Sequence, residues 1–165
     1  MRKYLLLLLI FSCSKLHAQT NTPAFSGGFE LAAPSRSAYK IGFGGSIKLE
    51  VPITTPVDLT LTGGFTALAF KSDLLNSSDK HVAARFVPLK AGVRYFASPG
   101  LYAEGEAGVA IETNYAKQNS FAFSIGPGFM FPLDVKDQID LGFRYEHWAN
   151  QLTQTGIRIA YRFGL

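Results

Sequence analysis

The chain has 165 residues, which is enough for one domain and too few for two domains with separate cores. Sixteen lysines and arginines against twelve aspartates and glutamates give a net charge of +4 and a pI near 9.2. Arg2, Lys3 and Lys15 lie in an N-terminal segment that we expect to be removed, which leaves 13 cations against 12 anions. The remaining cations are spread singly, so the composition excludes a nucleic-acid-binding surface.

Residues 1–18 have the pattern of a secretory signal peptide. A positive start at Met1–Lys3 is followed by the apolar run Leu5–Phe11, and Ala18 supplies the small residue that signal peptidase requires. The apolar run is too short for a transmembrane helix, which needs roughly 20 residues. We therefore predict export, cleavage near Ala18, and one mature domain over residues 19–165.

The single cysteine, Cys13, lies inside this leader. An alternative interpretation is a lipoprotein whose lipid is attached to Cys13, although Phe11 is bulky for the motif that directs lipidation. If Cys13 is removed with the leader, the mature chain has no thiol and no disulfide.

From residue 24 onward the chain alternates apolar and polar residues with a period of two, as in Tyr39–Val51 and Ile157–Leu165. A helix would bring together side chains three and four apart, and these sets do not follow that spacing. The predicted strands are 24–33, 39–51, 57–70, 85–96, 101–113, 121–133, 139–148 and 155–165. Most have about the 9–11 residues that a tilted strand needs to cross a bilayer. An even number of such strands joined by hairpins predicts an all-β, eight-stranded antiparallel up-and-down transmembrane β-barrel.

The two faces of the predicted strands differ in composition, and this difference indicates which face points into the barrel. Most of the 16 glycines share a face with the charged residues, whereas most phenylalanines and tyrosines lie on the other face. An eight-stranded barrel has an interior just wide enough to be filled by side chains, so the rings are expected to face lipid. By parity the interior then holds Lys40, Lys48, Lys90, Arg94, Arg144, Arg158 and Arg162 with Glu30, Glu50, Asp58, Glu104, Glu106, Glu112, Asp140 and Glu146.

Seven cations against eight carboxylates make this predicted interior nearly neutral. The favoured interpretation is a structural network of salt bridges, because an isolated buried ion is very costly. A path for protons or ions is the alternative. In either case we expect no wide channel. The connections 34–38, 71–84, 114–120 and 149–154 would face outward, and 71–84 is the longest of them.

The mature sequence resembles the small bacterial outer-membrane barrels of the OmpA and OmpX type. Its leader, Leu16-His17-Ala18-Gln19, is similar to signal peptides of Bacteroidetes-type bacteria. The last strand resembles the assembly signal of these barrels at Gln154, Gly156, Ile159 and Tyr161, although the chain ends in Leu165. The resemblance implies a monomer in the outer membrane, inserted by the barrel assembly machinery and in contact with outer-membrane lipids, including lipopolysaccharide.

The segment Phe143–Asn150 is similar to the Arg-aromatic-x-His-x-Ser-Asn motif of PagL-type lipid A deacylases. His147 and Asn150 match the family's histidine and asparagine, but Ala149 stands where the family has its nucleophilic serine. No acidic residue follows Glu146, so the orienting carboxylate is also missing. We expect a non-enzyme, with a degenerate relative that still holds lipid A as an alternative. In the simplest interpretation, His147 and Trp148 anchor the barrel at the headgroup level.

The other candidate sites are weaker. His81, with Ser77 and Asp79, lies in a polar loop, and two mature histidines cannot build a typical zinc site. Glu104 and Glu106 would both point inward, without the cleft that a glycosidase needs. We therefore expect neither a metal nor a cofactor. A soluble periplasmic carrier barrel with its faces swapped is the remaining alternative.

Overall fold

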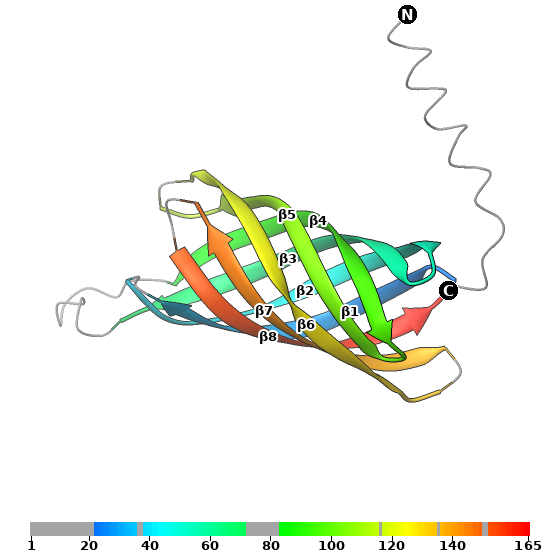
Figure 1. Ribbon diagram of the computed structural model, residues 1–165. Coiled ribbons are helices and arrows are strands. Elements are labelled where there is room, and N and C mark those ends of the chain that lie inside the picture. The colour runs from blue at the N-terminus through cyan, green and yellow to red at the C-terminus, as the bar shows by residue number, and fades with distance from the viewer. Residues whose placement is uncertain (1–21, 36–37, 72–82, 116, 135, 150–151) are drawn as a thin grey trace, which may run out of the picture.

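The computed structural model describes residues 22–35, 38–71, 83–115, 117–134, 136–149 and 152–165 (Figure 1). Its eight strands form one closed antiparallel barrel in chain order, with β1 paired to both β2 and β8. The strands are β1 (Ala24–Ser35), β2 (Tyr39–Thr54), β3 (Val57–Phe70), β4 (Ala84–Ser98), β5 (Leu101–Glu112), β6 (Asn119–Pro132), β7 (Asp137–Trp148) and β8 (Leu152–Gly164). The predicted fold class is confirmed, and each strand begins and ends within three residues of its expected position. Over these ranges, no helix is long and apolar enough to cross a membrane.

The two ends of the barrel differ in their connections. The β2–β3, β4–β5 and β6–β7 turns lie at the end where β1 begins and β8 finishes, which we call the turn end (Figure 1). The other four connections lie at the opposite end, the loop end. In the β4–β5 turn Gly100 has a φ of +84°, and a Cβ there would lie 2.8 Å from the carbonyl oxygen of Met130. Glycine is therefore required at this tight turn.

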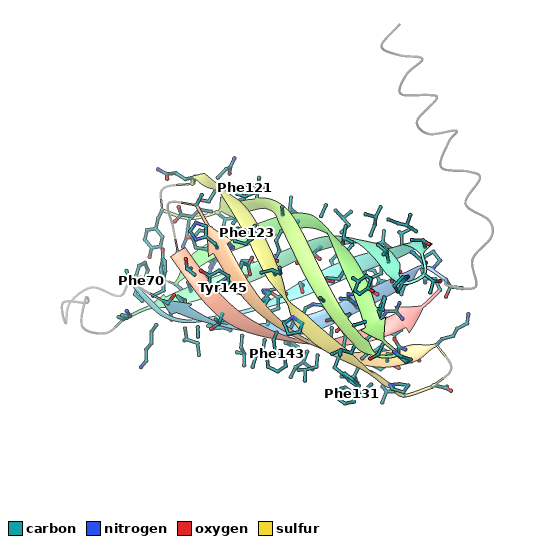
Figure 2. All side chains as sticks on the ribbon, viewed as in Figure 1. Phe70, Phe121, Phe123, Phe131, Phe143 and Tyr145 are labelled. Carbon is teal, nitrogen blue, oxygen red and sulfur yellow. The ribbon has the colours of Figure 1, made fainter. Side chains whose placement is uncertain are left out.

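The outer wall is mainly apolar. Phe29 is 83% exposed, and Phe121, Phe131 and Phe143 point away from the wall on the strands where Figure 2 labels them. The inward positions carry serine, threonine, glutamate, lysine and arginine, many of them fully buried. This distribution matches a barrel surrounded by lipid and is the reverse of that in a soluble carrier.

The interior near the loop end is apolar, which the sequence analysis did not anticipate. Phe86 packs on Trp148 with ring centroids 4.9 Å apart, and both side chains are buried. The complete cluster is Leu68, Ala84, Phe86, Ala110, Ala122, Trp148 and Leu152, with Tyr39 and Phe70 packed against it. We call it the apolar cap. Trp148 therefore lies inside the barrel and is not a headgroup anchor.

A β-bulge at the start of β2 reverses the expected direction of two side chains. Tyr39 pairs with Phe70 and Ile41 with Ala69, so Lys40 is an extra residue in the ladder. Because of this insertion Tyr39 packs against the apolar cap, while Lys40 is exposed on the outside. The placement of Lys40 in the interior is thus corrected, since strict alternation does not hold across a bulge.

Candidate functional site

The middle of the barrel interior holds six cations and six carboxylates connected by ion pairs. Ten of them form a closed ring in which positive and negative charges alternate. In order around the ring these are Arg94, Glu104, Lys48, Glu106, Lys90, Glu146, Arg144, Glu30, Arg158 and Asp140, which returns to Arg94. Glu50 and Arg162 extend the ring from Arg94. The whole set, which we call the charge ring, has no net formal charge.

Arg94, on β4, is the member of the charge ring that pairs with three carboxylates, and it is completely buried. Its three nitrogens reach three carboxylates: Nη1 to Glu50 at 2.9 Å, Nε to Glu104 at 2.7 Å and Nη2 to Asp140 at 3.2 Å. Its guanidinium also lies 3.9 Å from the ring centroid of Tyr102, a cation–π contact. Tyr102 in turn donates a hydrogen bond to Asp140 at 2.5 Å. Every side of this cation is therefore occupied by a compensating group.

Arg144, on β7, closes the opposite side of the ring. Its Nη1 and Nη2 donate to the two oxygens of Glu30 at 2.8 and 2.5 Å, the bidentate geometry that favours arginine. Ser46 donates to Glu30 at 2.6 Å and accepts a hydrogen bond from Arg158 at 2.9 Å. A neutral hydroxyl thus bridges two members of the ring.

The lysines occupy the same kind of environment. Lys90 lies 3.0 Å from Glu146 and 3.3 Å from Glu106, and Lys48 contacts both Glu104 and Glu106. Thr62 and Ser124 donate to the two oxygens of Glu106 at 2.5 and 3.2 Å. The sequence analysis did not single out these hydroxyl partners; their inward parity was the available signal.

Three residues expected in the network do not join it. Lys40 is outside the barrel because of the bulge, whereas Asp58 and Glu112 are buried inside. Within the described part of the chain, neither carboxylate has a cation within 4 Å. Glu112 lies near the loop end, opposite Phe86, whereas Asp58 lies opposite Arg94 on the neighbouring strand without forming an ion pair.

The charge ring leaves almost no free space. The cavity beside Lys48, Glu104 and Arg144 has a volume of about 20 Å³, enough for about one water molecule. The apolar cap lies between the ring and the loop end. This arrangement can fix the strands relative to one another, and the described side chains fill the interior at these two levels.

His147, the candidate from the segment that is similar to PagL-type deacylases, lies on the outer wall and is half-buried. Its Nδ1 is 2.8 Å from Thr153 Oγ1, and its ring lies 6.0 Å from that of Phe123. Trp148 is on the other side of the wall, where its Nε1 donates to Glu146 at 2.9 Å. Asn150 is outside the described residues.

A nucleophilic dyad needs a histidine within hydrogen-bond reach of a hydroxyl, and usually a third group that orients the histidine. Among the described residues no carboxylate lies within 4 Å of His147, so no acidic group orients its ring. His81, Ser77 and Asp79 also lie outside the described residues. Glu104 and Glu106 are both members of the charge ring. The described part of the chain contains no group of three or more side chains that could hold a metal ion.

A closed eight-stranded barrel with an apolar wall and a filled, charged interior defines a small transmembrane β-barrel. No protein-family model and no curated protein matches the sequence. Among solved structures, the chain is similar to Ail, the attachment invasion locus protein of Yersinia pestis, with a TM-score of 0.59 at 15% identity over 87% of this chain and 100% of Ail. OprG, an outer-membrane protein of Pseudomonas aeruginosa, matches with a TM-score of 0.57 at 13% identity over 91% and 97% of the two chains.

A de novo designed transmembrane barrel is also similar, with a TM-score of 0.54 at 16% identity over 87% of this chain and 98% of the design. At these identities the likeness is one of fold. An attachment invasion locus protein, another natural outer-membrane protein and a designed barrel share the architecture, so the architecture alone does not assign a role.

Proposed function

We propose that this chain is an integral outer-membrane barrel that catalyses no reaction and forms no wide pore. It is inserted as a monomer by the barrel assembly machinery after cleavage near Ala18, with its loop end outward. Its role is to strengthen the envelope by contacting outer-membrane lipids, including lipopolysaccharide, through its wall. The signal peptide, the apolar wall and the similarity in fold to outer-membrane barrels support this location.

The observation that carries the proposal is the charge ring beneath the apolar cap. An ion entering the barrel would have to separate buried pairs such as Arg94–Asp140, and breaking one buried pair costs about 3–5 kcal/mol. The apolar side chains of the cap add a further barrier, because they cannot replace the water around a hydrated ion.

The proposal is tested with the mature chain refolded in detergent. An unboiled sample should migrate differently from a boiled one on a denaturing gel, and the folded protein should give no porin-like conductance in planar bilayers. A general porin serves as the positive control for the bilayer. Porin-like currents would contradict the closed interior, and release of the cellular protein by carbonate without detergent would contradict its membrane location.

A second candidate is a lipid A deacylase relative. It is favoured by one observation, the outward placement of His147 beside the hydroxyl of Thr153. Lipid A extracted from cells with and without the protein is compared by mass spectrometry. Identical spectra are expected. Loss of one acyl chain that is abolished by His147→Ala would establish the enzyme.

A further inference from the structure

We propose that a hollow on the outer wall, which runs from β6 across β7, β8 and β1 to Lys40 on β2, is a specific site for lipid A. One acyl chain would lie in the hollow and a phosphate on the Lys40 ammonium. This inference deepens the proposed function, because it depends on the loop end facing the outer leaflet. Arg144 is the one member of the charge ring that borders the hollow, and its guanidinium is held in the interior by Glu30 and Glu146.

The hollow has a volume of about 590 Å³, within the range of roughly 300–1,000 Å³ typical of small-ligand sites. It lies between two rows of outward side chains that cross neighbouring strands. Ala33 and Thr155 pair in the row nearer the loop end, and Leu31 and Ile157 pair in the other. The small side chains of the first row create the depression, and the lining is otherwise mainly apolar.

Polarity on this face increases toward the loop end. From Phe143, β7 runs toward the loop end past Tyr145, which Figure 2 shows nearer that end, and then to His147. His147 is bonded to Thr153, whose carbonyl accepts a hydrogen bond from Ser35 at 3.2 Å. Polar side chains on the lipid-facing wall are expected where the bilayer interior gives way to its headgroups. The hollow therefore ends at the headgroup level.

Lys40 lies at the edge of the hollow, where the β2 bulge has turned it outward. In the part of the chain that the structure describes, no carboxylate lies within 4 Å of its ammonium. Among the described residues, the other charged side chains on the outside of this end are Lys71, Arg85 and Lys117, and none of the three lines the hollow. The ammonium of Lys40 thus complements an anionic headgroup, and the adjoining apolar hollow favours an anion that carries acyl chains over a soluble one.

A second hollow serves as an internal comparison. It lies between β2, β3, β4 and β5, has a volume of about 520 Å³ and contains the outward Ala91. Its only lysine, Lys90, points inward and belongs to the charge ring. The two hollows are therefore similar in size and in their apolar lining, but only the first has an exposed cation at its edge.

The experiment measures lipid retention by native mass spectrometry of the full mature chain in detergent. The added lipids are bis-phosphorylated hexa-acyl lipid A, phosphatidylglycerol and phosphatidylcholine. Two variants disturb the site: Lys40→Gln removes the charge and Ala33→Trp fills the hollow. Their matched controls are Arg85→Gln, a cation at the same end, and Ala91→Trp, in the comparison hollow.

The wild-type chain should retain one lipid A in preference to the other lipids. Lys40→Gln should weaken retention on the order of ten-fold or more, the scale of a lost charge-assisted hydrogen bond. Ala33→Trp should weaken it similarly, and both controls should bind as the wild type does. Equal losses in Ala33→Trp and Ala91→Trp, no loss in Lys40→Gln, or equal retention of phosphatidylglycerol would each overturn the site. The gel-mobility shift separates these outcomes from failure of the barrel proposal, because every variant must first migrate as a folded barrel.

Discussion

Replacement of Arg94 by methionine tests whether the charge ring holds the barrel together. The substitution keeps an unbranched chain of similar length and removes a guanidinium that contacts Glu50, Glu104 and Asp140. Three carboxylates, of which Glu50 and Asp140 are buried, then lose their shared cation, and Tyr102 loses its cation–π partner. Removing one partner of a buried ion pair costs about 3–5 kcal/mol, so Arg94→Met should lower the free energy of unfolding by at least that amount.

The assay is equilibrium unfolding in urea in lipid vesicles, followed by the fluorescence of the single tryptophan, Trp148, which is buried in the apolar cap. Arg85→Met is the matched control, because Arg85 is exposed on the same strand, and it should change stability by less than about 0.5 kcal/mol. Adding Asp140→Asn to Arg94→Met restores neutrality and should recover part of the loss. Equal stabilities of the Arg94→Met and Arg85→Met chains would refute a structural role for the ring.

Three further predictions use the same unfolding assay. Gly128→Ala should destabilise the barrel by about 1–3 kcal/mol, since its Cβ would lie 2.1 Å from the Tyr102 ring, whereas Gly27→Ala, with nothing within 4 Å, should be near neutral. Phe86→Ala should cost about 3–5 kcal/mol because it empties the apolar cap, and a cost no greater than that of the lipid-facing Phe121→Ala would show that the cap is dispensable. Raising NaCl from 0.1 to 1 M should leave the wild-type stability nearly unchanged, because buried pairs are screened far less than exposed ones; a steep loss would mean that solvent ions reach the ring.

The sequence by itself determined the class of fold and the direction of most side chains. Period-two alternation defines two faces in any strand. Eight strands joined by short connections leave no unpaired edge strand only if the sheet closes into a barrel. The width of such a barrel then sends glycines and charges inward and rings outward. Arg94 and Glu104 were placed in the interior by this parity alone, and the structure finds them 2.7 Å apart.

Only the tertiary structure decided which charges meet. Arg94 and Asp140 are 46 residues apart, on β4 and β7, and they touch because the tilt and stagger of the strands bring them to one level. Alternation tells which face of the strand a residue lies on, but not its position along the barrel axis relative to a distant strand. It therefore could not distinguish the residues that join the charge ring from Glu112, which does not. It also failed at Lys40, because a bulge is a property of two paired strands. That one inserted residue moves Lys40 from the interior network to the lipid-facing edge of the hollow.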